Sequence, residues 1–203
     1  MKKHGTYLYN TDFADRFADA FDKASSDKAS WHAYHEIYSH LLAGRDVSSF
    51  LEIGLFLSDT EPHTDLHAWA EIFPNAEIFG ADWKSHLLFE DGRIKTFFVN
   101  QDDPASFDEL KKDLPEKIDV ILDDASHMLE KTITTFEQTF DLVADGGLYL
   151  IEDILVRRYS ESDWEQNIDE ILEYFSKTGL SYEVYSSSTI RKCVDSIVLA
   201  VFK

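Results

Sequence analysis

The sequence predicts an α/β fold with an open, doubly wound and mainly parallel sheet, and three observations carry this prediction. Short apolar runs rich in β-branched residues alternate with segments of helical apolar spacing along almost the whole chain. Acidic residues follow several of these runs, as is typical of strands that end at a ligand-binding edge. The 203 residues suffice for a single domain with a substantial core.

The first 46 residues are expected to form an N-terminal helical cap on a core that spans residues 47–203. Apolar residues at helical spacing predict a helix over residues 12–24. A polar segment then leads into a second helix that runs toward Gly44. Lys28, His32 and Tyr34 of this segment either cover a ligand or serve as capping and surface residues.

The core strands are predicted at residues 47–53, 76–81, 94–99, 118–122 and 148–151, followed by closing strands at 182–185 and 196–202. Helical spacing predicts helices over 65–73, 107–114 and 133–143 between them, and a last helix that begins at a capping box at 162–165 and ends at Gly179. Asp145-Gly146-Gly147 is expected to act as a breaker before the strand at 148–151.

Composition limits the partners of the chain. The net charge of −20 should repel nucleic-acid phosphates and anionic membranes, so the substrate is expected to be neutral, cationic or metal-bridged. The single cysteine, Cys193, excludes internal disulfides and cysteine-based metal sites. No signal-peptide core or transmembrane stretch is present, so we expect a cytoplasmic protein; homo-oligomer formation stays open.

Carboxylates gather where two predicted strands end. Asp124 follows the strand at 118–122, and Glu152 and Asp153 follow the strand at 148–151. Adjacent parallel strands would bring these acids together, and their mutual repulsion favours a bound Mg²⁺, Mn²⁺ or Ca²⁺ ion. His127 lies close enough in sequence to act as a general base. The alternative is that these acids only cap helices and face water.

A nucleotide-type cofactor is indicated by the ends of the first two core strands. Gly54 is the glycine available where the backbone must approach a ligand closely. Asp82 ends the second strand, where an acid commonly binds a ribose diol, and Glu52 would flank the same ligand. Asp82 can also be read as a simple turn residue.

These residues resemble the class I S-adenosylmethionine-dependent methyltransferases. The likeness is to the metal-dependent sugar O-methyltransferases of the macrocin and mycinamicin type and their cephalosporin-hydroxylase-named relatives, and it covers roughly residues 27–153. It is carried by the motifs Asp27-Lys28 with His32 and Tyr34, Leu51-Glu52-Ile53-Gly54, Phe73-Pro74-Asn75-Ala76, Gly80-Ala81-Asp82, Asn100-Gln101, Asp123-Asp124-Ala125-Ser126-His127 and 146–153.

The resemblance implies a Rossmann-like, seven-stranded sheet with an antiparallel last strand. It also implies that Asp124, Glu152 and Asp153 hold Mg²⁺ and that His127 is the general base. S-adenosylmethionine would bind in a pocket to which we assign ten residues: Lys28, His32, Tyr34, Glu52, Gly54, Ser58, Asp82, Asn100, Gln101 and Asp123.

The activity implied by the resemblance is methyl transfer from S-adenosylmethionine to a hydroxylated small molecule, such as a sugar of a natural product. Two alternatives stay open. The first strand is followed by a single glycine, which favours a degenerate cofactor-fold protein that binds without turnover. A different reaction of S-adenosylmethionine at the same site is the second.

Overall fold

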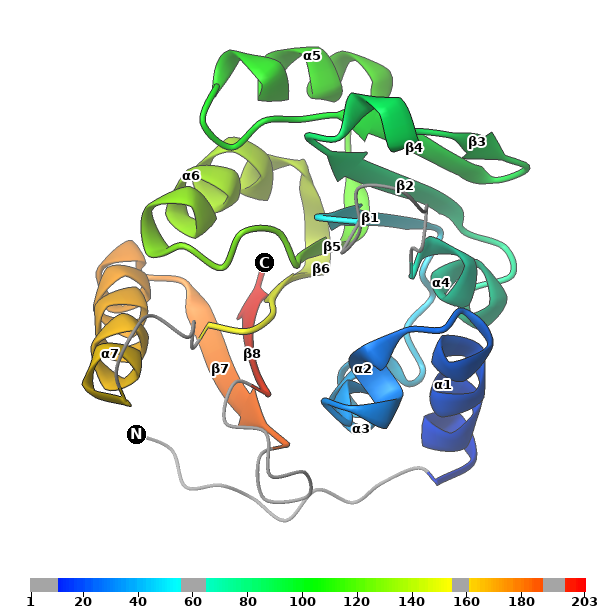
Figure 1. Ribbon diagram of the computed structural model, residues 1–203, viewed down its shortest axis with the longest axis horizontal. Coiled ribbons are helices and arrows are strands. Elements are labelled where there is room, and N and C mark those ends of the chain that lie inside the picture. The colour runs from blue at the N-terminus through cyan, green and yellow to red at the C-terminus, as the bar shows by residue number, and fades with distance from the viewer. Residues whose placement is uncertain (1–10, 56–64, 155–160, 188–195) are drawn as a thin grey trace.

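The computed structural model describes residues 11–55, 65–154, 161–187 and 196–203. Within these ranges, eight strands form one sheet in the order β3-β4-β2-β1-β5-β6-β8-β7 (Figure 1). The strands are β1 (Ser49–Ile53), β2 (Glu77–Asp82), β3 (Glu90–Asp91), β4 (Ile94–Phe98), β5 (Ile118–Asp123), β6 (Val143–Ile151), β7 (Ser181–Ser186) and β8 (Ile197–Phe202).

The five central strands β4, β2, β1, β5 and β6 pair in parallel, while β8 pairs antiparallel to both β6 and β7. The predicted parallel sheet with an antiparallel last strand is therefore confirmed. The predicted count of seven strands is one too low, because β3 forms a short antiparallel hairpin with β4 at the edge of the sheet.

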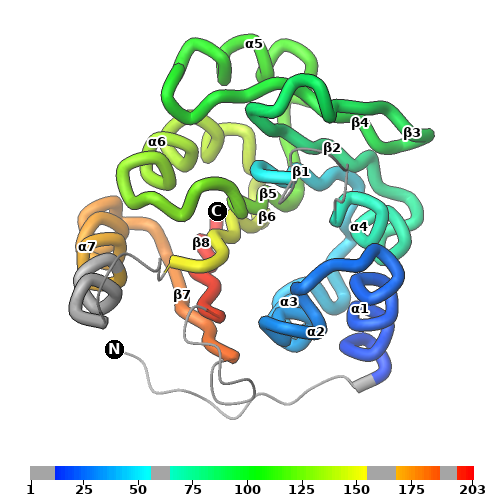
Figure 2. Tube along the Cα trace, viewed as in Figure 1, coloured from blue at the N-terminus to red at the C-terminus, as the bar shows by residue number. Residues whose placement is uncertain are grey.

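Helices cover both faces of the sheet, as the traces in Figures 1 and 2 show. One face carries α1 (Thr11–Lys23), α2 (Asp27–Ser30), α3 (Tyr34–Leu42) and α4 (Leu66–Ile72), and the other carries α5 (Ala105–Asp113), α6 (Leu129–Thr139) and α7 (Glu161–Thr178). Two 3₁₀ turns are η1 (Ser85–Leu87) and η2 (Phe140–Leu142). None of the helices in the described ranges has the length and apolarity needed to span a bilayer.

β1, at the centre of the sheet, is buried on both sides because its successive side chains enter different cores. In β1, Phe50 packs in the core under α1, α3 and α4, whereas Leu51 packs in the core under α5, α6 and α7. The strand therefore reads in the sequence as a continuous apolar run.

The proposed breaker before β6 is wrong. β6 begins at Val143 and runs through Gly146 and Gly147, with a register irregularity against β5 between Ile118 and Val120. A Cβ atom on Gly147 would lie 2.7 Å from the carbonyl oxygen of Asp119, so glycine permits close contact of the two strands there.

The register places the key strand ends at one level. Ile53, Asp123 and Ile151 are paired across β1, β5 and β6, so the next residues leave the sheet at the same edge. The peptide nitrogen of Asp124 bonds the carbonyl of Ile53, and that of Glu152 bonds the carbonyl of Asp123. The carboxylates predicted to converge are therefore delivered to one edge of the sheet.

Candidate active site

A cavity of about 600 Å³ opens at this edge of the sheet, and we call it the strand-end cavity. Of the residues predicted to bind cofactor, metal or substrate, the following line it: His32, Gly54, Asp82, Asn100, Gln101, Asp124, His127, Glu152 and Asp153. Strand ends far apart in the sequence thus share one cavity, as expected for an open α/β sheet.

Four predicted cofactor residues do not line the cavity. Lys28, Tyr34, Glu52 and Asp123 are buried and engaged with other groups. The structure places them behind the cavity wall, and their part in cofactor binding stays a prediction. Ser58 lies outside the described residues.

Gly54 fits the cavity floor because it has no side chain. Its φ is +94°, and a Cβ atom there would lie 2.3 Å from the carbonyl oxygen of Asp124 and 2.5 Å from the Cα of Ala125. The loop after β1 can therefore pass against the loop after β5 only with glycine at this position.

Gly54→Ala should lower the melting temperature more than Gly44→Ala. Gly44 also has a positive φ of +76°, but a Cβ atom there would meet nothing within 4 Å. The control therefore carries only the backbone strain, whereas Gly54→Ala adds a clash that costs about 1–3 kcal/mol, or at least about 2 °C in a domain of this size. Equal melting temperatures in a thermal scan would contradict this account.

Asp82 links two turns at the end of β2. Its Oδ2 accepts a bond of 2.9 Å from the peptide nitrogen of Leu55, and its Oδ1 accepts one of 2.8 Å from that of Lys84. The carboxylate is buried yet lines the cavity. It fixes the loop after β1 and leaves lone pairs for a ligand.

The loop after β4 supplies amide side chains to the same cavity. Gln101 donates a bond of 2.7 Å to the hydroxyl of Thr135, and Asn100 accepts one of 3.0 Å from the peptide nitrogen of Asp102. Asp102 is paired with Lys131 at 2.8 Å. These bonds hold the amide groups at the cavity wall.

Lys28 lies in the centre of an acidic cluster beside the cavity. Its Nζ is 2.5 Å from Asp124 Oδ2, 2.5 Å from Glu152 Oε2, 3.2 Å from Asp65 Oδ2 and 3.5 Å from Glu52 Oε1. Burial acts to lower the pKa of Lys28, but the four carboxylates together hold that pKa well above its ordinary value. The lysine is therefore a fixed cation.

Burial raises the pKa of Glu52 and Asp65, and it raises the pKa of Glu152 to about 7 although Lys28 opposes the shift.

Sequence reasoning did not find Asp65 or the buried role of Lys28. Asp65 carries no motif of its own, and Lys28 sits on a helix of only four residues.

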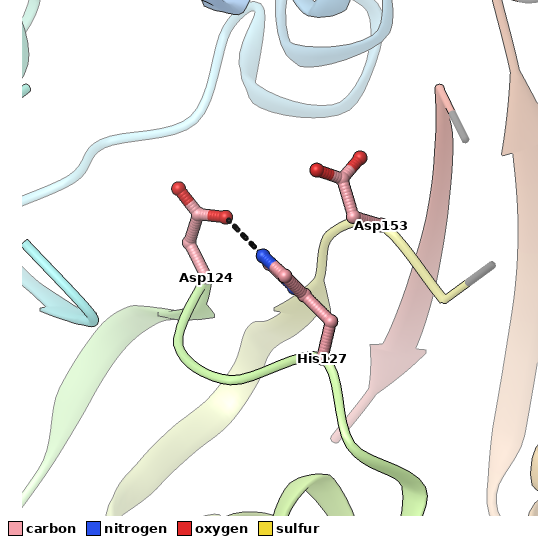
Figure 3. Close-up of side chains that lie close together, drawn as sticks. All are labelled: Asp124, His127 and Asp153. Carbon is pink, nitrogen blue, oxygen red and sulfur yellow. Dashed lines mark ion pairs between the residues drawn. The ribbon is translucent and has the colours of Figure 1, made fainter. Parts of the chain in front are cut away.

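Asp124, His127 and Asp153 form the group best placed for a metal ion. One potential ligand atom from each lies within 4.8 Å of the others. The His127 ring lies between the two carboxylates in Figure 3, with its Nε2 3.7 Å from Asp124 Oδ1. His127 and Asp153 both have positive φ, +53° and +49°, a strained conformation that proteins keep mainly at functional sites.

The oxygen donors of Asp124 and Asp153 fit a hard divalent ion, and the nearby imidazole can serve as ligand or base. Glu152, the predicted third ligand, is absent from this group. Its Oε2 accepts from Lys28, and its Oε1 accepts from the hydroxyl of Tyr38. Both oxygens of the Glu152 carboxylate are therefore engaged by Lys28 and Tyr38.

Two residues predicted to bind the cofactor instead orient Asp153. The hydroxyl of Tyr34 donates to Asp153 Oδ1, and His32 Nδ1 lies 3.8 Å from the same oxygen. The His32 and Tyr34 rings stack with centroids 4.9 Å apart. His32 still lines the cavity, whereas Tyr34 is buried and does not line it.

Asp123 is a buried carboxyl at the end of β5 whose Oδ2 has no hydrogen-bond partner among the described residues. Burial raises its pKa from 3.8 to about 8; Asp124 adds to the shift, and the bond from the peptide nitrogen of Ala125 opposes it. The group is therefore protonated in the folded protein at neutral pH.

Asp123→Asn should stabilise the protein increasingly as the pH rises from about 4 to about 8. In that window the unfolded wild-type chain releases a proton that the folded chain retains, so wild-type stability falls, whereas the amide does not titrate. With EDTA present, the variant should melt at least about 2 °C above wild type at pH 8. A difference that does not grow with pH would contradict this.

The chain is similar to sugar O-methyltransferases of natural-product pathways. It is 35% identical over 136 residues to 8-demethyl-8-(2-methoxy-alpha-L-rhamnosyl)-tetracenomycin-C 3'-O-methyltransferase of Streptomyces olivaceus, covering 64% of this chain and 34% of that protein. It is 36% identical over 89 residues to demethylmacrocin O-methyltransferase of Streptomyces fradiae, covering 44% and 22%. The chain thus spans about a third of the length of the first relative. No protein-family model matches it.

Solved structures show the same fold. The methyltransferase MycE of the mycinamycin pathway, in complex with Mg, SAH and mycinamycin VI, superposes with a TM-score of 0.71 at 23% identity, over 92% of this chain and 54% of that one. An O-methyltransferase from Bacillus cereus in complex with SAH gives 0.59 at 13% identity, over 93% and 91%. The expected Rossmann-like methyltransferase fold is confirmed.

Proposed function

We propose that this chain carries out S-adenosylmethionine-dependent, divalent-metal-assisted O-methylation of a hydroxylated small molecule, such as a sugar of a natural product. The observation that carries the proposal is the shared cavity, which Gly54 and Asp82 line beside Asp124, His127 and Asp153. The similarity to sugar O-methyltransferases supports the same reaction class.

The cofactor would lie against the ends of β1, β2 and β4. Gly54 lets the backbone approach a ligand closely, Asp82 offers carboxylate lone pairs to a ribose diol, and Asn100 and Gln101 line the adjoining wall. Methyl transfer to oxygen needs alignment more than covalent help, so this rigid wall has a direct role.

Asp124 and Asp153 would hold the ion, and the ion would supply Lewis-acid activation of the acceptor hydroxyl. His127 Nε2 would accept the hydroxyl proton, and Asp124 Oδ1, 3.7 Å away, would stabilise the resulting imidazolium. Tyr34 keeps the Asp153 carboxylate oriented. Glu152 would not contact the ion, because its carboxylate oxygens accept hydrogen bonds from Lys28 and Tyr38.

Calorimetric titration with S-adenosylhomocysteine, with and without Mg²⁺, tests the binding part of this proposal. We expect binding in both conditions, and no binding in either would contradict it. Binding without formation of a methylated product from any hydroxylated acceptor would instead favour a binding protein. The cytoplasmic location, the exclusion of nucleic-acid and membrane partners, and self-association remain predictions.

Asp82→Ala should weaken S-adenosylhomocysteine binding at least about tenfold, because each charge-assisted bond to a ribose hydroxyl contributes about 1.5–3 kcal/mol. Asp119→Ala is the matched control. Asp119 also bridges two peptide nitrogens, those of Ser48 and Ser49 at 2.8 and 3.0 Å, but it lies at the opposite edge of the sheet. A dissociation constant raised equally in both variants would show that Asp82 acts only on loop structure.

A further inference from the structure

The acidic cluster around Lys28 contains a second set of oxygens with the spacing of a metal site. Single carboxylate oxygens of Glu52, Asp65 and Asp124 lie within 4.8 Å of one another. They come from β1, from the residue before α4 and from the loop after β5, so three separate segments converge on one point. The Lys28 ammonium lies within 3.5 Å of all three acids.

We propose that Lys28 occupies a second cation position beside the Asp124–His127–Asp153 group, and thereby limits the chain to one divalent ion and positions Asp124. A divalent ion bound by these oxygens would need ligand distances of about 2.0–2.6 Å. Such an ion would overlap the space that the ammonium fills. The two cations therefore exclude each other.

Asp124 is shared between the two positions. Its Oδ2 accepts from Lys28, while its Oδ1 faces His127. Lys28 therefore fixes the rotation of this carboxylate so that one oxygen points toward Asp153 and His127. It is a positioning residue, because it acts on the proposed metal position through Asp124.

Glu152 is fixed in the same way. Its Oε2 accepts from Lys28 at 2.5 Å, and its Oε1 accepts from Tyr38. Without the ammonium, Glu152 would become a fourth oxygen donor to the second position. Lys28 thus determines both how many ions the cluster accepts and which acids they contact.

Lys28→Met tests the proposal, because methionine fills a similar volume without the charge. Bound Mn²⁺ is counted by electron paramagnetic resonance of the free ion, and melting temperature is recorded with and without Mn²⁺. We expect one ion per chain in wild type and two in Lys28→Met. Lys23→Met is the matched control, since it removes an exposed lysine paired with Glu71 at 2.5 Å and should leave one ion.

Mn²⁺ should also raise the melting temperature of Lys28→Met more than that of wild type, because the ion replaces the lost ammonium. The double variant Lys28→Met/Asp65→Asn replaces one carboxylate of the second position by a neutral amide and should bind one ion again. Two ions in that double variant would place the extra ion elsewhere and overturn the proposal.

Three further outcomes also overturn it: two ions in wild type, one ion in Lys28→Met with the wild-type affinity, or failure of Lys28→Met to fold with Mn²⁺ as well as without it. The inference rests on the proposed function only through Asp124. If wild type binds no ion and Lys28→Met binds one, the role of Lys28 stands and the proposed catalytic metal centre fails.

Discussion

Asp124→Ala should abolish metal-dependent methyl transfer while the chain stays folded. Asp124 supplies an oxygen to the proposed ion and faces the proposed base, so its loss removes the stabilisation that the ion gives to the reacting oxygen. That stabilisation amounts to several kcal/mol, which corresponds to at least about 10³ in rate. The measurement is the initial rate of S-adenosylhomocysteine formation with saturating Mg²⁺.

Asp102→Ala is the matched control for this variant. Asp102 lines the same cavity and is paired with Lys131, but it lies outside the Asp124–His127–Asp153 group. Its loss should change the rate little. Near-ultraviolet circular dichroism would check that Asp124→Ala keeps its fold despite the loss of one Lys28 partner. Wild-type activity that survives EDTA unchanged would refute the metal role.

His127→Asn should lower kcat by about 10² to 10⁴, the usual contribution of a general base. Asparagine is the suitable replacement because it tolerates the positive φ of +53° at this position. Since Asp124 and Asp153 are the proposed oxygen ligands, Mn²⁺ and S-adenosylhomocysteine affinities should stay close to those of wild type.

His67→Asn is the control for loss of an imidazole. His67 pairs with Asp91 at 3.3 Å on the exposed surface, so its replacement should leave kcat unchanged. Loss of Mn²⁺ binding in His127→Asn would make His127 a ligand. A lower melting temperature with normal kcat would make it a structural residue.

The sequence was sufficient to predict that the carboxylates meet, because parallel strands must end at a common edge. Apolar runs located β1, β5 and β6, and the acids after them fall at one level of the sheet. The strand β4 was predicted, but the short strand β3 that pairs with it was missed, although the two-residue loop between them begins with Gly92, a recognised turn signal. A strand of two residues has too little pattern to detect.

The sequence could not predict which atoms the site residues contact. Lys28 was expected near the cofactor, but contacts with acids 24 to 124 residues away bury it. Glu152 was expected on the metal together with Asp124 and Asp153, yet both of its carboxylate oxygens accept hydrogen bonds from Lys28 and Tyr38. Long-range contacts of this kind depend on the packing of α2 and α3 against the sheet.

The most direct test of the central claim, that one cavity holds both the cofactor and the ion, is paramagnetic broadening of bound S-adenosylhomocysteine by Mn²⁺ in proton nuclear magnetic resonance. We expect Mn²⁺ to broaden the resonances of the bound ligand in wild type. Asp124→Ala should still bind the ligand but lose the broadening. Ligand that binds wild type saturated with Mn²⁺ and shows no broadening would contradict the account.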